Sequence, residues 1–283
     1  MSEPSAPFPG PLAAVWLTVG SWLLTGIVLG ALVEPLGPMA ALGFGLAVGL
    51  GGTATLAARR VPPPQAERVG LQGFAPRLLL AMLLLVPAVL LTSEIDNVVR
   101  SLLPPAPAPQ PTGEAERLAT GLDALQTAIV MVGIAPVVEE FFFRGVVQQG
   151  LVALGGPLRG VLGAAILYAL GHGNLVTTPS GWLSATVGGL VLGLLLGGLR
   201  LASGSVLAPV LLSMSLQAVG FVAIQLEAEL PIPGFNAPGD HTPLPWLAAA
   251  AGSVAAGVWL LTREGRRAPP ERLTPDQLSP PRA

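Results

Sequence analysis

The sequence predicts an all-α, polytopic membrane helix bundle with about eight transmembrane helices. Only 11% of the 283 residues are charged, 52% are hydrophobic, and the mean hydropathy is +0.69. Soluble domains carry about 25% charged residues, so this chain has roughly half the charge that a water-exposed surface needs. A soluble enzyme is therefore excluded. The 36 Gly do not indicate disorder, because disordered chains are polar, whereas small residues let membrane helices pack closely.

The first three spans are bounded by charged residues. A transmembrane helix needs about 20 predominantly apolar residues. Runs of this kind cover residues 11–33, 36–58 and 78–98, and the third carries Glu94 and Asp96 near its far end. A polar connector precedes the third span, and the Pro-rich stretch LLPPAPAPQPTGEAER follows it, which a helix cannot cross.

The stretch from Leu118 to Leu154 is too long for one crossing of a bilayer, at about 1.5 Å per residue. It predicts a short outer helix that leads into a main span at residues 135–154. A Gly-Gly-Pro turn then reverses the chain. The remaining predicted spans are residues 159–172, 182–200, 205–226 and 243–262.

The arginines predict the orientation, since all 14 basic residues are Arg. With a cytoplasmic N-terminus, eleven arginines fall inside, Arg100 and Arg117 fall outside, and Arg144 lies in the membrane. This asymmetry agrees with the positive-inside rule, so we expect both termini to be cytoplasmic in a bacterial inner membrane. The predicted inner set is Arg59, Arg60, Arg68, Arg77, Arg159, Arg200, Arg263, Arg266, Arg267, Arg272 and Arg282.

The net charge of −2 and the lack of Cys exclude several classes of function. Without a basic field, nothing indicates a nucleic-acid partner. Without Cys, disulfides, thiolate metal sites and a Cys nucleophile are excluded. Two His, the carboxylates and the hydroxyls remain for any chemistry.

Three ionisable residues lie within the segment APVVEEFFFRG, where a charge costs several kcal/mol unless it is paired. Glu140 and Arg144 are four residues apart and can form a pair on one helical face. Glu139 lies about 100° around the helix from Glu140, so it need not share that Arg. A buried cluster that only fixes helix packing is the alternative interpretation, and it fits Glu139 less well.

His172 is predicted to lie at the same depth as Glu139. Glu139 precedes Gly156 in the turn by 17 residues and His172 follows it by 16, so both lie roughly 25 Å from the turn. Ser213 and Gln217, four apart on a later helix, reach a similar layer. A carboxylate, an imidazole, a hydroxyl and an amide could therefore converge in the bundle interior.

These residues resemble two motifs of the CPBP family of intramembrane proteases, also called the Abi or type II CAAX prenyl protease family. The first motif, two Glu and then an Arg after three residues, matches Glu139, Glu140 and Arg144. The second motif, an aromatic residue four before a His, is similar to Tyr168 and His172.

The third motif of the family departs from its usual form in this chain. Ser213 stands at the usual His position and Gln217 at the usual Asn position, and the whole resemblance covers residues 119–226. In the family these positions donate hydrogen bonds to the oxyanion. A hydroxyl and an amide can also donate, so the resemblance implies an oxyanion hole of altered composition.

The resemblance further implies that Glu139 acts as the general base with His172 to activate water for attack on a peptide carbonyl. Glu140 and Arg144 would shape the site. Catalytic zinc takes three protein ligands, and Glu139, Glu140 and His172 are the only strong candidates. We therefore expect no cofactor and a metal-free water, with a divalent metal such as zinc as the alternative.

The expected function is that of an intramembrane endopeptidase in the lipid bilayer that cleaves a peptide or a membrane-associated protein. The altered residues Ser213 and Gln217 leave open a catalytically silent family member that binds peptides or a partner protein. A small transporter is disfavoured, because the ionisable residues cluster in one layer and no inverted repeat is visible.

The sequence predicts three parts in the chain. Two further features are interpreted as structural rather than functional. Residues 1–110 hold N-terminal membrane helices and a connector, 111–230 a CPBP-like protease core, and 231–283 the last transmembrane helix and a polar tail. His241 is expected to be solvated outside the core. A four-residue repeat of glycines predicts close helix packing: Gly189, Gly193 and Gly197.

Overall fold

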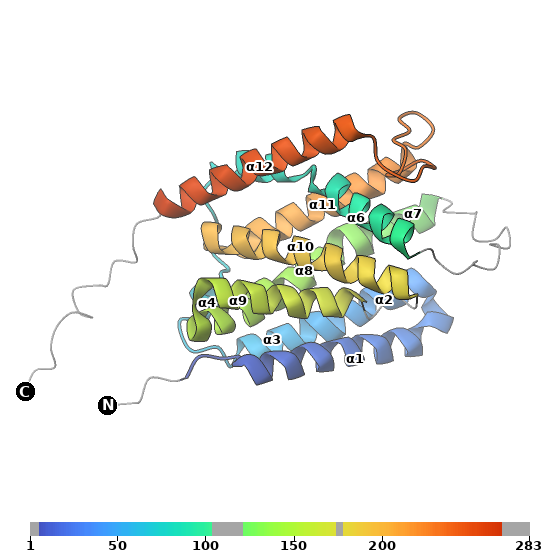
Figure 1. The fold of residues 1–283 in the computed structure, drawn as a ribbon. Helices are drawn as coiled ribbons and strands as arrows, with labels where there is room; N and C mark the ends of the chain where they lie inside the picture. The colour runs from blue at the N-terminus through green and yellow to red at the C-terminus, as the bar shows by residue number, and fades with distance from the viewer. Residues whose placement is uncertain (1–5, 104–120, 174–177, 268–283) are drawn as a thin grey trace, which may run out of the picture.

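The protein is a bundle of helices that run roughly side by side (Figure 1). The structure is a computed structural model, and it describes residues 6–103, 121–173 and 178–267. Within these residues it contains no strand and has seven helical segments long and apolar enough to cross a membrane. The predicted fold class is therefore confirmed: this is an all-α, multi-pass membrane protein.

The first two spans form a helical hairpin. Helix α1 (Pro11–Leu36) packs against α2 (Pro38–Leu46), which continues through the π-helical η1 (Ala47–Gly52) into α3 (Thr53–Ala58). Helix α1 extends three residues beyond the predicted end, because the helix is broken only at Gly37, whose positive φ of 77° starts the turn.

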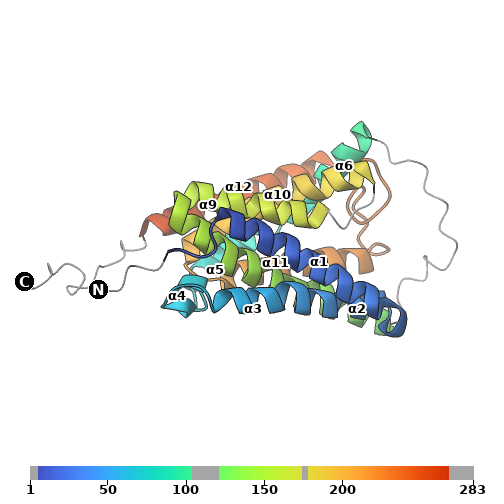
Figure 2. The ribbon, with the colours of Figure 1, turned by 90° about the horizontal axis from the view of Figure 1, so that it is seen from below.

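The third span is interrupted by a proline. A short helix, α4 (Gln65–Val69), lies in the connector, and α5 (Leu78–Leu85) and α6 (Ala88–Leu102) form the span. Pro87 separates the two because it lacks the N–H that a continuous helix needs. Figure 2 shows α4 beside the end of α3.

The next segment is one helix rather than the predicted short outer helix and separate main span. Pro136 lacks an N–H, but the wider π-helical turns before it allow the helix to continue, so no break forms there. The elements are α7 (Gly121–Thr127), η2 (Ala128–Ile134), α8 (Ala135–Glu140), η3 (Phe141–Val147) and α9 (Gln148–Gly173).

Helix α9 contains the predicted reversal. Gly156 has a non-helical backbone with a φ of 78°, and Pro157 follows it. Phe143 and Tyr168, on either side of this turn, have ring centroids 5.2 Å apart, so the two arms are antiparallel. The apolar segment that contains the turn, Asp123–Gly173, therefore crosses the membrane twice. Each of the other six segments crosses once, so the total is eight crossings, as predicted.

The last three spans are α10 (Pro179–Ser203), α11 (Leu207–Gln225) and α12 (Leu244–Arg267). The predicted glycine stripe packs α10 against α9: a Cβ at Gly193 would lie 2.9 Å from the Cα of Ala165. Gly189 approaches Ala169 in the same way. The predicted close helix packing is confirmed.

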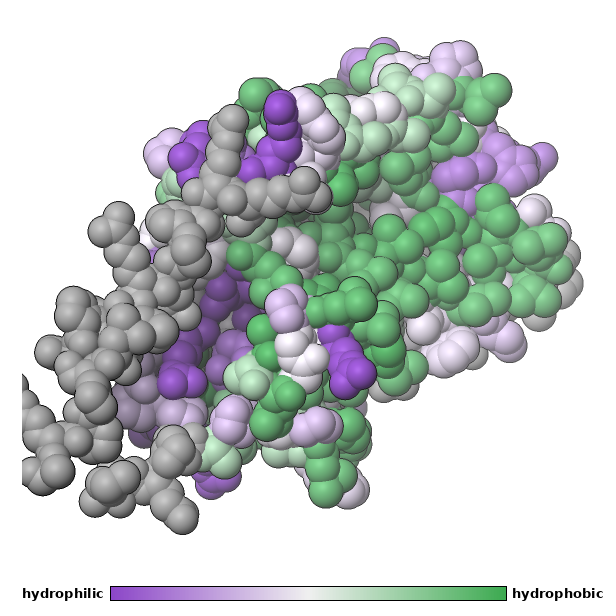
Figure 3. Space-filling view, turned by 60° about the vertical axis from the view of Figure 1, so that its left-hand side comes forward, coloured by the Kyte–Doolittle hydropathy of each residue, from purple (hydrophilic) through white to green (hydrophobic). Residues whose placement is uncertain are grey.

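Buried apolar side chains form two clusters. One joins α1, the second span, η2, α8, η3 and the second arm of α9, and its aromatic members are Phe142, Phe143 and Tyr168. The other joins α5, α6, α10, α11 and α12 around Leu85, Leu199 and Leu212. Large apolar residues also cover the sides of the bundle, as a bilayer-facing surface requires (Figure 3).

Helix α1 begins and α12 ends at the same end of the bundle (Figure 1). Most predicted inner arginines lie on elements that begin or end there, including Arg68 on α4 and Arg200 on α10. The predicted Pro-rich loop and the polar tail lie largely outside the described residues. So do Arg117, Arg272 and Arg282.

Candidate active site

Glu139 and His172 meet across the α8–α9 hairpin. The Oε2 atom of Glu139, on α8, lies 3.4 Å from the Nε2 atom of His172, at the end of α9. The Glu139 side chain is 9% exposed and the His172 side chain 27% exposed. The matching depth that the residue count predicts is confirmed, and the pair can be reached by a small molecule such as water.

The His172 ring is oriented by its own helix. Its Nδ1 atom lies 3.0 Å from the backbone carbonyl oxygen of Tyr168. A carbonyl can only accept, so Nδ1 carries the proton in this contact and the neutral imidazole has its lone pair on Nε2. Glu139 and His172 therefore direct two proton acceptors toward the same point, where a shared proton or a water molecule satisfies both.

Glu140 and Arg144 form the predicted pair, which is completely buried. Arg144 Nη1 donates to Glu140 Oε1 at 2.8 Å, and the two side chains are 1% and 0% exposed. Arg144 Nη2 also donates to the carbonyl oxygen of Gly193 on α10, at 3.3 Å. The pair thus ties η3 to α10 directly behind the Glu139–His172 pair.

Tyr168 lies between the Arg144 guanidinium and the His172 imidazole. The guanidinium carbon of Arg144 lies 4.2 Å from the centre of its ring, and the ring centroids of Tyr168 and His172 are 4.1 Å apart. Phe143 packs edge-on against the same ring. The second-motif aromatic therefore connects the buried ion pair to the imidazole through a stack of side chains.

Trp22 is a neighbour of the site that the sequence analysis missed. Its ring is edge-on to His172 with a centroid distance of 6.1 Å, and its indole Nε1 is buried with no hydrogen-bond partner among the described residues. A Trp in the middle of a span rather than at its end was the available signal. A groove of about 540 Å³ between α1 and α9 begins here, lined by Val15, Thr18, Val19, Trp22, Leu23, Gly26, Leu167, Leu170 and Gly171.

The two third-motif residues differ in their environment. Helix α11 packs against α8 and η2, and Ser213 is buried on it, 6% exposed. Gln217, one turn further along, is exposed. The structure thus places the hydroxyl in the interior next to the element that carries Glu139 but leaves the amide outside, and the oxyanion role of both stays a prediction.

The side chains that converge here do not make up a zinc site of the usual composition. Structural and catalytic zinc sites use at least three protein ligands. Glu140 is bound to Arg144 through Oε1 and keeps only Oε2 without a partner, and Glu139 and His172 contact each other. No group of three His, Cys, Asp or Glu with metal-binding geometry occurs in the part of the chain that the structure describes.

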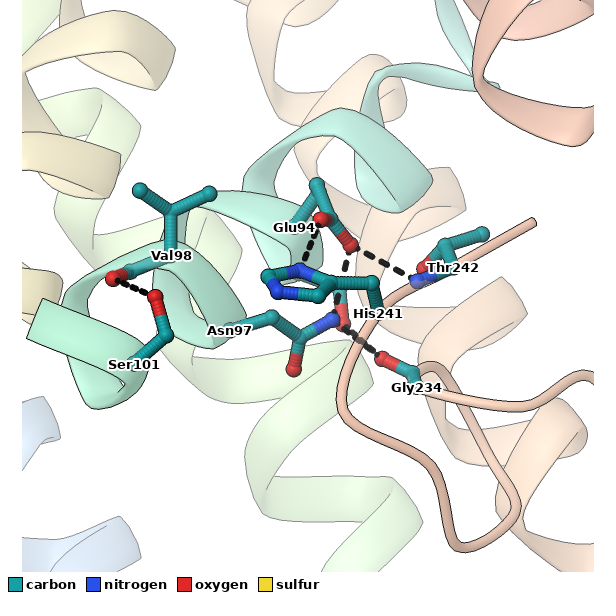
Figure 4. A network of polar contacts seen from close by, with 8 residues as sticks. Glu94, Asn97, Val98, Ser101, Gly234, His241 and Thr242 are labelled. Atoms are coloured by element: carbon teal, nitrogen blue, oxygen red, sulfur yellow. Dashed lines mark hydrogen bonds and ion pairs between the residues drawn. The ribbon is translucent and has the colours of Figure 1, made fainter. Parts of the chain in front are cut away.

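A second Glu–His contact lies outside the candidate site (Figure 4). His241 Nδ1 lies 2.7 Å from Glu94 Oε1, and Glu94 Oε2 accepts from the backbone N–H of Thr242 and from Asn97 Nδ2, each at 2.8 Å. Asn97 also donates to the carbonyl oxygen of Gly234. His241 is thus half exposed but bound to Glu94, rather than simply solvated as the sequence analysis expects.

The other predicted outer carboxylate, Asp96, belongs to a different contact. It pairs with Arg100 at 2.6 Å on the exposed face of α6. The contacts around His241 therefore involve Glu94 and not Asp96.

Comparison with known families identifies the part of the chain that carries the site. Residues 121–219 match the model of a family described as type II CAAX prenyl endopeptidase Rce1-like. The match contains Glu139, Glu140, Arg144, His172 and Ser213 and excludes α1, which supplies Trp22. Comparisons with curated proteins and with solved structures found no significant match.

Proposed function

We propose that this chain, which belongs to the Rce1-like CAAX prenyl endopeptidase family through residues 121–219, is an intramembrane endopeptidase. Its substrate would be a peptide or a membrane-associated protein that reaches the bundle from the bilayer. The observation that carries the proposal is the contact between Glu139 and His172, because it joins two proton acceptors at a partly exposed point in the membrane.

In the proposed reaction Glu139 transfers the proton and His172 holds the attacking water by a hydrogen bond. A water molecule hydrogen-bonded to Glu139 and His172 gives a proton to the Glu139 carboxylate as its oxygen attacks the peptide carbonyl carbon. The tetrahedral intermediate then breaks its C–N bond, and the same proton passes to the leaving amine. One water is consumed, and an acid and an amine are released.

Three neighbours would position these groups. The Tyr168 carbonyl holds the His172 ring through Nδ1, and the ion pair of Glu140 and Arg144 supports Tyr168 from behind. A buried, preorganised arrangement of this kind reduces the reorganisation that the transition state requires. None of these steps needs a metal ion.

A catalytically silent, peptide-binding family member is the second candidate, and one observation favours it. The family's oxyanion donors are replaced by Ser213 and Gln217, and Gln217 is exposed. With a single hydroxyl available, the developing oxyanion would be less stabilised than in a site with two donors.

One experiment separates the two candidates. The purified protein in detergent would be incubated with a peptide library, and the products of the wild type, Glu139→Gln and His172→Ala would be identified by mass spectrometry. We expect cleavage by the wild type and loss in both variants. Glu67→Gln, an exposed carboxylate on α4, is the matched control and should cleave as the wild type does.

Two results would contradict the protease. Cleavage that persists in Glu139→Gln would come from a contaminant or from another mechanism. A wild type that binds peptides but cleaves none of them would establish the silent candidate.

The orientation is also part of the proposal. The end of the bundle where α1 begins carries most of the described arginines, so we place it at the cytoplasmic face. The Glu139–His172 pair then lies in the opposite half of the bundle, far from the α9 turn.

A further inference from the structure

A second pocket lies at the arginine-rich end of the bundle, and the proposed proteolysis does not use it. It encloses about 240 Å³ between α4, η3, α9 and α10. Figure 3 shows hydrophilic side chains in a recess at this end. The pocket is lined by Arg68, Arg144, Gln148, Gln149, Val152, Ala153, Arg200 and Leu201.

The lining of this pocket carries an excess of positive charge. Three guanidinium groups contribute to it and no carboxylate does. Arg144 is neutralised by Glu140, whereas Arg68 and Arg200 form no ion pair with any residue that the structure describes. Two cationic groups therefore remain without a counter-charge beside apolar side chains, which favours an anionic ligand.

Arg200 is held in place by the α4 connector. Its Nη2 atom donates to the carbonyl oxygen of Arg68 at 3.0 Å, and the whole residue is 9% exposed. Gly70 has a φ of 83°, and a Cβ there would lie 2.4 Å from the same Nη2 atom. The connector thus leaves room for the guanidinium only because residue 70 has no side chain.

Two buried polar atoms of this pocket lack partners. The Nε atom of Arg200 is a donor and the Oε1 atom of Gln148 an acceptor, and neither has a hydrogen bond within the described residues. The amide nitrogen of Gln148 donates to the Gly197 carbonyl, and its oxygen is left buried without a partner next to Gly197. A ligand that satisfies both atoms must accept from a guanidinium and also offer a hydroxyl or amine proton.

The place of the pocket in the bundle narrows the choice of ligand. Its lining residues Arg68 and Arg200 lie on elements that begin or end where the arginines assign the cytoplasmic face, the side on which lipid headgroups would be near. Its apolar members, Val152, Ala153 and Leu201, are compatible with the glycerol and acyl part of a lipid. Basic pockets between transmembrane helices on this side of the membrane bind anionic headgroups.

We propose that this pocket binds the phosphate of an anionic phospholipid whose headgroup carries a hydroxyl, as phosphatidylglycerol does. Arg200 and Arg68 donate to the phosphate oxygens, and Gln148 accepts from the headgroup hydroxyl. Arg144 lines this pocket and also forms the ion pair with Glu140.

The test measures lipid binding and does not depend on the proposed proteolytic activity. The thermal unfolding temperature of the full chain in detergent would be followed against short-chain phosphatidylglycerol, phosphatidylcholine of equal chain length, and inorganic phosphate. We expect saturable stabilisation by phosphatidylglycerol, with an apparent affinity about tenfold weaker in Arg200→Gln and in Arg68→Gln. Arg68 is exposed, so its substitution should leave folding intact even if Arg200→Gln does not.

Arg60→Gln is the matched control, because Arg60 is an exposed arginine near the same end that does not line the pocket. It should keep the affinity of the wild type. Equal stabilisation by both lipids, or equal weakening in the control, would overturn the proposal in favour of general surface electrostatics. Equal stabilisation by inorganic phosphate at the same concentration would overturn the lipid as the source of the phosphate.

Discussion

The molecule contains two carboxylate–imidazole pairs with opposite surroundings. Glu94 uses both of its carboxylate oxygens: one contacts His241, and the other accepts from Asn97 and from the backbone of Thr242. Among the described residues the Glu139 side chain makes one polar contact, with His172, and it is longer, 3.4 Å against 2.7 Å.

The difference shows how the same two residue types serve separate purposes. A carboxylate with all its hydrogen bonds satisfied holds structure, and in this case it attaches the loop before α12 to α6. A carboxylate with unused lone pairs beside a second base can take a proton from water. Hydrogen-bond satisfaction, rather than residue identity, thus separates the proposed catalytic pair from the structural one.

The largest expected effect concerns turnover. Glu139→Gln should lower peptide cleavage about a thousandfold, since it removes the general base, whereas Glu94→Gln should leave the rate within about twofold. Initial rates on one cleaved peptide would measure both. Equal losses in the two variants would mean that the outer pair is also required for catalysis, and the distinction between them would fail.

The next effect concerns stability behind the proposed site. Arg144→Leu leaves the buried carboxylate of Glu140 without its partner and should cost about 3–5 kcal/mol. The double variant with Glu140→Gln should recover part of that loss, because no buried charge remains. Thermal unfolding in detergent would measure both.

The matched control for this stability effect is Arg100→Leu, which breaks the exposed pair with Asp96. It should cost less than about 1 kcal/mol, because exposed ion pairs contribute little. A loss as large as that of Arg144→Leu would contradict the importance of burial.

A smaller effect should distinguish the outer pair. Glu94→Gln weakens the contacts to His241 and Thr242, and we expect a cost of about 1–2 kcal/mol with faster proteolytic cleavage in the loop at residues 226–243. Asp96→Asn, on the same helix, should leave that loop as resistant as in the wild type. Limited proteolysis with mass spectrometry would locate the cuts, and an unchanged loop would remove the structural role of Glu94.

The smallest effect tests the altered third motif. Ser213→His places the family's usual residue beside α8 and should raise turnover by up to about tenfold if an oxyanion donor is what limits the wild type. The steady-state rate on the best peptide would show it. A lower rate with unchanged unfolding temperature would indicate that the Ser213 hydroxyl already makes the better contact.

Sequence patterns predicted the parts of the site that depend on counting along a helix. The shared depth of Glu139 and His172 follows from their separations of 17 and 16 residues from Gly156, and the Glu140–Arg144 pair follows from a four-residue spacing. Helix geometry alone determines the spacing of the ion pair and the shared depth of Glu139 and His172, whereas the contact between these two side chains also requires the two arms to pack face to face.

The contacts that depend on how one helix faces another were not predictable in this way. Trp22 meets His172 because of the rotation of α1 about its axis, which side-chain packing determines. Gln217 lies four residues from the buried Ser213 and is nevertheless exposed, since the edge of the interface falls between them. His241 contacts Glu94 because of the path of the loop that carries it, and apolar periodicity does not predict the path of a loop.

The hairpin at Gly156 also has a consequence for the order in which the protein assembles during synthesis. Glu139 and His172 lie on its two arms, so their contact needs only the closure of one local loop, while Glu94 and His241 are 147 residues apart in the chain. Chains emerge from the N-terminus and fold as they do so. The Glu139–His172 contact can therefore form as soon as its own hairpin has inserted into the membrane. The Glu94–His241 contact forms only when the last span arrives.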